Sequence, residues 1–589
     1  MNQLHRTNLL KCILSGFLLL AAGCATSKPP LATIVPDGKP HTFEARDHQF
    51  WIDGQPTLLL SGEMHFGRVQ PEDWDTRIKQ AKAMGLNTIS FYLFWNMVEP
   101  EEGKFDFSGM TDVRRVLKLC QDNGMWCILR PGPYCCAEIE YGGIPYWTLK
   151  YPNVKIRTDD PQWLAWCRSY LSAVYQQVAD FQVSKGGPLL MVQVDNEYGI
   201  TSPQVAPGNN NYMVALAKIF KEVGFSAQLF ECDPTYAPEW KDPSWRIPGL
   251  MICRNGLASD SMYNVSKDAI GDYPVFVPEV YPAWFLGWGD GITKQYHDKS
   301  QIPVIVNWTS YLLDHHFSFN YYVFFGGTNY GFDNGSLYFD AVQTSYDYSA
   351  PIDEAGRTTP KYYALRDLLI KKLGIHPPAP PPEPVVINIP AIQFTAREPL
   401  LDTLPAKPTL TAAQPVSMEN LNQAYGFVDY RKQFPNGLNG TLVLKDPMDY
   451  AIVMVNGKTV GKAFKGYGPD SDTIAVNAAG PATLDILVYN LGRISVVTNE
   501  LTQQFASKGV LGGATLNGQD LTDWEMYSLP YVSGPDKFVT DNSLVPPAGP
   551  TFYHATFTLD KVGGTFLDLR NWSFGVVWVN GHNLGRFWD

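Results

Sequence analysis

The sequence predicts an α/β fold, a (β/α)8 barrel of the TIM type followed by C-terminal all-β domains of the jelly-roll or β-sandwich kind. Between residues 45 and 375, short apolar or β-branched runs alternate with longer amphipathic stretches, as in βαβ units. Beyond residue 386, short alternating runs are separated by Gly, Asn and Asp turns. The chain has 589 residues, more than one hydrophobic core accommodates, so several domains are expected.

The barrel prediction depends on strand candidates, of which there are eight, the number that this fold requires. Each is short, rich in β-branched or aromatic residues, and followed by a polar or Gly-rich segment. The candidates are Leu58 to Met64, Thr88 to Trp95, Trp126 to Pro131, Leu189 to Asp195, Ala227 to Cys232, Leu250 to Cys253, Val275 to Glu279 and Asn320 to Phe325.

The segments between these strands carry helix signals. Apolar residues recur at spacings of three and four from 74 to 84, and Gly85 follows as a stop signal. Asp160-Pro161 supplies the N-cap and first-turn residues of a helix that runs toward Phe181. Asp233 to Trp245 has no regular pattern, so the crossover after the fifth strand is the least defined.

The clearest domain boundary is a proline-rich stretch. A last helix, Lys361 to Leu373, stops at Gly374 and runs into prolines that favour extended geometry. The predicted organisation is a signal peptide (1–24), an N-terminal tether (25–44), the barrel (45–375), a Pro-rich linker (376–386), a β-sandwich module (387–500) and a second jelly-roll-like module (501–589) that we expect to be truncated.

Two similar phrases support the pair of β modules. The run from Tyr450 to Gly457 resembles the run from Phe574 to Gly581, and both end in Asn-Gly, a strong hairpin signal. Such modules either bind sugar or brace the barrel, and bracing is the expectation favoured here.

The N-terminus predicts export. Arg6 and Lys11 precede an apolar run from Cys12 to Ala22, which is too short to span a bilayer. The sequence Leu19 to Cys24 resembles a bacterial lipobox, so we expect Cys24 to be lipidated and the mature protein to be a membrane-anchored lipoprotein, periplasmic or at the cell surface. The alternative is an ordinary signal peptide cleaved nearby.

Charge and cysteine content exclude other classes of protein. A net charge of -12 leaves no electrostatic footprint for nucleic acid. Seven cysteines lie between Cys120 and Cys253 without CxxC or His-rich spacing, so no metal is assigned, and no cofactor is expected.

Carboxylates at strand ends are the candidate chemical groups, since the C-terminal ends of barrel strands form the active face. A glycosidic bond is cleaved between two facing carboxyls. Glu63, Glu138, Asp195, Glu197 and Glu279 all qualify. Residues two apart on a strand share a face, so spacing alone does not rank Glu197 above Asp195.

Six phrases in order along the chain resemble the β-galactosidases of glycoside hydrolase family 35, a retaining family built on a TIM barrel. The resemblance covers most of the mature sequence. The phrases are Ser61 to Phe66, Tyr92 to Asn96 with Glu99-Pro100, Arg130 to Glu138, Gln193 to Gly199, Gly326 to Asn329 and Thr344 to Pro351.

This resemblance implies a role for each matching residue. Glu197 would be the acid/base and Glu279 the nucleophile, about 5 to 5.5 Å apart as retention requires. Asn196 would hold the sugar 2-hydroxyl, and Glu138 would bind further hydroxyls. The other positions that match the family's galactose pocket are Tyr92, Cys136, Ala137, Tyr322 and Tyr348. Ile139 departs from the family, which has an aromatic residue there.

The implied activity is that of an exo-acting β-galactosidase, which removes terminal β-galactose from an oligosaccharide or polysaccharide side chain by double displacement. One alternative is a β-glycosidase for another terminal sugar, such as glucosamine. A second, from a different class, is a non-catalytic glycan-binding surface lipoprotein. The paired glutamates argue against this second alternative.

Overall fold

The computed structural model describes residues 34–589 except 202–209, 236, 238–245, 290–300, 338–339, 465–472, 497–504, 536, 541–546 and 589. The predicted signal peptide and Cys24 therefore lie outside the described residues, as does most of the irregular segment before Trp245. Within the described part, no helix is both long and apolar enough to cross a membrane.

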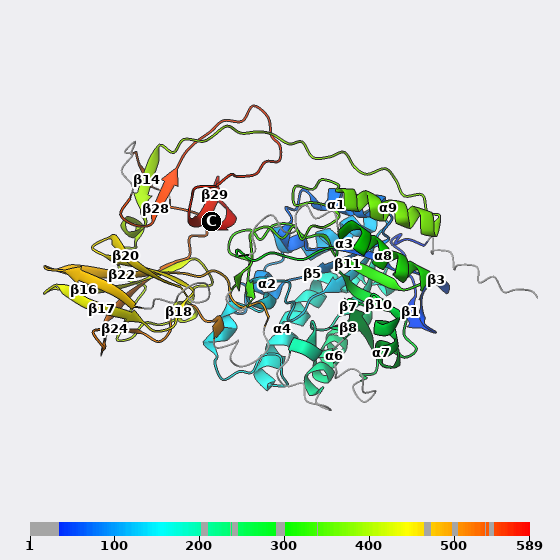
Figure 1. The fold of residues 1–589 in the computed structure, drawn as a ribbon. Coiled ribbons are helices and arrows are strands. Elements are labelled where there is room, and N and C mark those ends of the chain that lie inside the picture. Colours follow the sequence, from blue (N-terminus) through cyan, green and yellow to red (C-terminus); the bar gives the residue numbers. More distant parts are fainter. Residues whose placement is uncertain are drawn as a thin grey trace, which may run out of the picture.

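The eight predicted strands form a parallel sheet that closes into a barrel (Figure 1). Its order is β10-β11-β4-β5-β6-β7-β8-β9. The two end strands pack side by side, and Gly256 N, just after β9, donates to Glu279 O in β10 at 3.0 Å. The predicted fold class is confirmed. The strands are β4 (Leu60–Met64), β5 (Thr88–Tyr92), β6 (Trp126–Arg130), β7 (Leu189–Gln193), β8 (Gln228–Pro234), β9 (Leu250–Asn255), β10 (Phe276–Val280) and β11 (Ser318–Phe325).

Helices surround the barrel and end where the sequence predicts. Gly85 closes the first helix in a left-handed conformation with φ of 106°. The Asp160 side chain accepts from the backbone N–H groups of Gln162 and Trp163. The helices are α1 (Trp74–Met84), α2 (Trp95–Val98), α3 (Val113–Asp122), α4 (Pro161–Val178), α5 (Tyr198–Thr201), α6 (Asn211–Val223), α7 (Asp260–Ile270), α8 (Gln301–Asp314) and α9 (Pro360–Leu373).

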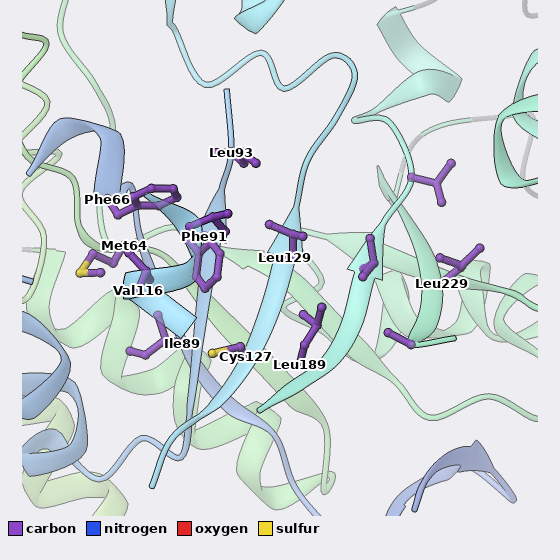
Figure 2. Packing of buried hydrophobic residues seen from close by; sticks show 14 of the residues in the cluster. Met64, Phe66, Ile89, Phe91, Leu93, Val116, Cys127, Leu129, Leu189 and Leu229 are labelled. Carbon is purple, nitrogen blue, oxygen red and sulfur yellow. The ribbon is translucent and has the colours of Figure 1, made fainter. Parts of the chain in front are cut away.

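A hydrophobic layer joins strands and helices. Figure 2 shows Ile89, Cys127 and Leu189 on neighbouring strands, with Val116 of α3 nearby, and all four are fully buried. In α3 the buried positions 113, 116, 117 and 120 follow the helical period, so one face of this helix is apolar and packs on the barrel.

The N-terminal end of the barrel is closed by a small sheet of β1 (Phe43–Arg46), β2 (Gln49–Ile52) and β3 (Gln55–Thr57). Phe50 and Ile52 pack with the interior residues Ile128, Met191 and Met251. The N-terminal end of the interior is therefore filled by apolar side chains.

The first β module is a sandwich of two sheets that lies beside the barrel in Figure 1. One sheet has the order β15-β26-β16-β22-β19-β20 and the other β21-β17-β24-β25. Their strands are β15 (Leu410–Ala412), β16 (Phe427–Phe434), β17 (Leu438–Leu444), β19 (Tyr450–Val455), β20 (Lys458–Phe464), β21 (Thr473–Ala478), β22 (Ala482–Tyr489), β24 (Ala514–Leu516), β25 (Gln519–Asp520) and β26 (Trp524–Leu529).

The sandwich corrects the predicted boundary between the β modules. Residues 501–529 were assigned to the second module, but β26 pairs with β16 and β24 pairs with β17. Trp524 and Met526 are fully buried in the core of the sandwich, which is incomplete without them. Pairing between strands almost a hundred residues apart leaves no local signal in the sequence.

The remaining β elements are short. β14 (Ala396–Pro399) lies between β27 (Val539–Thr540) and β28 (Thr551–His554), and the chain reaches β14 from α9 along an extended path across the top of Figure 1. The hairpin of β29 (Phe574–Val579) and β30 (His582–Trp588) packs on the barrel loops, where Arg586 donates to the carbonyls of Phe332 and Asn334. Two small pairs complete the set: β12 (Ser336–Leu337) with β13 (Asp340–Ala341), and β18 (Pro447–Met448) with β23 (Gly509–Val510).

The two similar phrases form equivalent hairpins. Asn456 and Gly457 have φ of 51° and 73°, and Asn580 and Gly581 have 51° and 81°. Positive φ at both central residues is what a type I′ turn requires. Each hairpin also has a register shift at the same place, after Val453 in one and Val577 in the other, so the likeness extends beyond the turn.

Candidate active site

The predicted catalytic carboxyls lie at the C-terminal ends of the barrel strands. Glu279 belongs to β10, and Glu197 follows β7 by four residues. Arg130 ends β6 and lies behind Glu279, and Glu63 lies in β4. Four strands thus bring charged groups to one place, as the barrel geometry predicts.

Arg130 fixes one face of the site. Its guanidinium is 1% exposed and donates to Glu279 Oε1 at 2.5 Å, to Glu63 Oε2 at 3.1 Å and to Gln193 Oε1 at 2.7 Å. The Tyr281 hydroxyl donates to the second oxygen of Glu279 at 2.9 Å. Both carboxylate oxygens of Glu279 therefore accept hydrogen bonds, which fix the orientation of the side chain.

The carboxyl of Glu197 has the opposite environment. Burial raises its pKa to about 8, and the negative charge of Glu279 acts in the same direction. Asn255, the last residue of β9, donates to Glu197 Oε1 at 3.0 Å and opposes this rise. Glu197 is therefore protonated near neutral pH, while Glu279 has the partners of an anion.

Spacing in the sequence did not distinguish Asp195 from Glu197, but the contacts of Asp195 are those of a structural residue. It is fully buried, accepts from Arg157 at 2.8 Å and from the Tyr212 hydroxyl at 2.5 Å. Both Asp195 and Glu197 have positive φ, 56° and 44°. The strand has ended at Gln193, so the two-residue period no longer applies and the two carboxyls have different partners.

Hydrogen bonds to the side-chain carbonyl oxygen fix the position of Asn196. Oδ1 accepts from the Tyr92 hydroxyl at 3.0 Å, from Gln193 at 3.1 Å and from Arg130 at 3.2 Å. The Cys232 thiol is a fourth donor to Oδ1, at 3.1 Å, whereas the amide Nδ2 has no protein acceptor among the described residues. It is therefore available to a ligand, and the structure brings the predicted residues Tyr92 and Asn196 together.

Three predicted residues, Cys136, Ala137 and Glu138, form a left-handed turn after β6. Their φ angles are 57°, 49° and 49°, a conformation that non-glycine residues rarely adopt. The Tyr346 hydroxyl donates to Glu138, and Arg68 donates to the Ala137 carbonyl at 2.6 Å. Burial raises the pKa of Glu138 to about 7. We call residues 136–138 the Cys-Ala-Glu turn.

Aromatic rings border the carboxyls on the side of β10 and β11. Tyr322 and Tyr348, both predicted, have ring centres 5.7 Å apart. Tyr281 lies 6.2 Å from Tyr322 and 5.3 Å from Trp284. Trp284 is 46% exposed, which makes its face available to an apolar sugar surface. Ile139, by contrast, is fully buried behind the turn.

A second carboxyl pair lies behind Glu197. Asp233 Oδ1 accepts from Gly199 N at 2.8 Å, and Glu231 Oε1 accepts from Arg254 at 3.2 Å. The other oxygens of the two carboxyls, Glu231 Oε2 and Asp233 Oδ2, are buried without a protein donor, and burial raises the pKa of both groups. A proton shared by the pair satisfies both oxygens. This arrangement anchors the backbone that follows Glu197.

Sequence reasoning missed several of these residues. Arg130 and Tyr346 occur in quoted phrases and Tyr281 beside Glu279, but none was assigned a role, and Asn255 was not noticed. The one sequence feature that could have indicated a role for Arg130 is its charge at the end of a buried strand. Among the described residues, no group of three His, Cys, Asp or Glu side chains is arranged to hold a metal, and the seven cysteines from Cys120 to Cys253 are free thiols.

Two carboxyls with different environments at the C-terminal end of a (β/α)8 barrel are what a glycoside hydrolase requires. The chain belongs to glycosyl hydrolases family 35, whose model matches residues 49–372. Residues 415–530 match the first all-beta domain of beta-galactosidase, and 550–589 match its galactose-binding domain.

Curated relatives are similar along almost the whole chain. A beta-galactosidase of Xanthomonas manihotis is 35% identical over 99% of this chain and 94% of its own length. The human beta-galactosidase-1-like protein 2 is 32% identical over 99% of this chain and 90% of its own. The dog beta-galactosidase is 31% identical over 93% and 84%.

Proposed function

We propose that the protein is a retaining exo-β-galactosidase that releases terminal β-D-galactose from oligosaccharides or polysaccharide side chains. The observation that carries the proposal is the unequal pair, in which Glu279 accepts hydrogen bonds from Arg130 and Tyr281 while the pKa of Glu197 is raised to about 8. A double displacement needs one nucleophile and one acid in these states.

In the first half-reaction, Glu279 attacks the anomeric carbon while the bond to the leaving oxygen breaks. Glu197 donates its proton to that oxygen, and the product is a covalent galactosyl ester of Glu279. Arg130 and Tyr281 orient the attacking carboxylate.

In the second half-reaction, Glu197 becomes the base. Esterification of Glu279 removes the negative charge that raised the pKa of Glu197, so the ionised form becomes more stable. Glu197 takes a proton from water, and the oxygen of this water attacks the anomeric carbon. The ester bond breaks, and galactose leaves with its β configuration retained.

Sugar recognition is assigned to the surrounding polar groups. We assign the 2-hydroxyl to Asn196 Nδ2, which the carbonyl contacts leave available. We assign Glu138 to further hydroxyls. The remaining contacts are assigned to Tyr92, Cys136, Ala137, Tyr322 and Tyr348.

A panel of aryl β-glycosides tests the substrate. The proposal predicts that the galactoside is hydrolysed fastest. Negligible action on the galactoside with good action on a glucosaminide would support the alternative sugar. Glycan binding by a wild type that is as inert as Glu279→Ala on every glycoside would support a binding protein instead.

We also propose that the protein is exported and anchored through lipid on Cys24, on the strength of the lipobox-like sequence Leu19 to Cys24. Mass spectrometry of the mature N-terminus tests this. A diacylated Cys24 is the expected result, and an unmodified first residue other than Cys24 would refute it.

A further inference from the structure

A segment of the sandwich domain enters the barrel domain beside the candidate active site. Residues 490–495 follow β22 and pair with the barrel segment at Ser336. Ser336 N donates to Arg493 O at 3.0 Å, and Ser495 N donates to Ser336 O at 2.8 Å. Arg493 and Ile494 are buried, so this contact is part of the protein interior.

The Arg493 side chain lies between two carboxylates, one from each domain. Its guanidinium contacts Glu140 of the barrel, and its backbone N–H donates to Glu140 Oε2 at 2.7 Å. On the sandwich side, Arg493 Nε donates to Glu419 Oε1 at 3.0 Å. All three side chains are buried, so removal of the arginine leaves two carboxylates without their counter-charge.

Glu140 lies two residues after the end of the Cys-Ala-Glu turn. Three consecutive non-glycine residues in left-handed conformations are strained, and such a backbone persists only where surrounding contacts fix it. Two of these contacts come from the segment that Arg493 and Ser495 hold. Gly335 N donates to Glu138 O at 2.9 Å, and Glu140 N donates to Asp333 O at 2.8 Å.

The sandwich segment 490–495 also packs directly against the chain that follows the turn. A Cβ on Gly142 would lie 2.6 Å from the Ser495 carbonyl oxygen, so the chain after Glu140 is packed directly against the sandwich. The domain contact thus reaches the sugar-binding turn through Glu140, through Gly335 and through Gly142.

We propose that Arg493 is a positioning residue for sugar binding, because it fixes the Cys-Ala-Glu turn through Glu140 and makes the sandwich domain a structural part of the sugar site. This inference rests on the proposed function, which assigns Glu138 to galactose hydroxyls. It gives the sandwich a role beyond general bracing of the barrel.

The test compares Arg493→Met with Glu419→Gln in the full chain. Both variants weaken the same buried cluster, but only the first removes the guanidinium contact with Glu140, while the backbone N–H of residue 493 still donates to Glu140. For Arg493→Met we expect KM for an aryl β-galactoside and the dissociation constant for galactose to rise at least tenfold, with kcat changed less than threefold. For Glu419→Gln we expect a lower Tm with KM within twofold of wild type.

Two further variants test the same contact if Arg493→Met does not fold. Glu140→Gln leaves Arg493 paired with Glu419 and should raise KM in the same way, whereas Arg493→Lys keeps the charge and should give an intermediate KM. A lower Tm with unchanged KM in both Arg493→Lys and Glu140→Gln would overturn the positioning role. An inactive wild type that still binds galactose would instead contradict the proposed function.

Discussion

The hydrogen bond from Asn255 to Glu197 sets the pH range in which the acid carries its proton. The bond is 3.0 Å long and stabilises the ionised form of a carboxyl whose pKa is about 8. A hydrogen bond to a charged group contributes about 1.5 to 3 kcal/mol. One pKa unit corresponds to about 1.4 kcal/mol, so Asn255→Leu should raise the pKa of Glu197 by about one unit or more.

The rise in the pKa of Glu197 can be measured from the pH dependence of kcat/KM. The alkaline limb of kcat/KM reports the acid of the free enzyme. Between pH 7 and pH 9, wild type should lose about nine tenths of its kcat/KM and Asn255→Leu about one half, from the titration of a single group at about 8 or about 9. The assay is initial-rate hydrolysis of an aryl β-galactoside from pH 5 to pH 10.

The matched control is Asn123→Leu. It removes an amide-to-carboxylate bond of similar length, 2.9 Å to Asp75, on the outside of the barrel. This control should leave the alkaline limb unchanged. An alkaline limb that stays in place or moves to lower pH in Asn255→Leu would refute the assignment of Glu197 as the titrating acid.

Three further predictions follow from the same contacts. Arg130→Met removes the counter-charge of the buried carboxyls Glu63 and Glu279, so we expect kcat/KM to fall at least a thousandfold and the free energy of unfolding to fall by about 3 to 5 kcal/mol. Steady-state kinetics and urea unfolding measure these changes, and a near-normal kcat would contradict the prediction. Glu197 binds a proton up to about pH 8 when folded but only up to its ordinary pKa of 4.5 when unfolded, so it makes stability fall as pH rises across this window. Glu197→Gln removes that loss and should raise Tm at pH 9 more than at pH 5; an equal change at both pH values would count against the raised pKa. Asp233→Asn keeps the acceptor for Gly199 and donates to Glu231 as the shared proton does, so kcat/KM should stay within threefold, and a loss above a hundredfold would exclude proton sharing.

Much of the fold could be predicted because its signals are local. The apolar period that ends at Gly85 and the cap at Asp160 each depend on a few neighbouring residues, and both are confirmed. The boundary placed after residue 500 was wrong, because the place of β26 depends on pairing with β16, which no nearby residue indicates.

The candidate site shows the same division. Glu197 and Asp195 differ only after the strand ends, where positive φ angles give them different partners, so spacing alone was insufficient. Arg130 joins groups from four strands, and the Arg493 contact joins two domains. Such convergence depends on closure of the barrel and docking of the sandwich, and it has no sequence period.

The most direct test of the central claim is to trap the covalent intermediate. A 2-deoxy-2-fluoro β-galactoside with a good leaving group slows release of the ester, so the labelled protein can be digested and its peptides mapped by mass spectrometry. The account predicts that the fluorogalactosyl group is attached to Glu279. Attachment to any other residue, or release of galactose with inverted configuration, would contradict it.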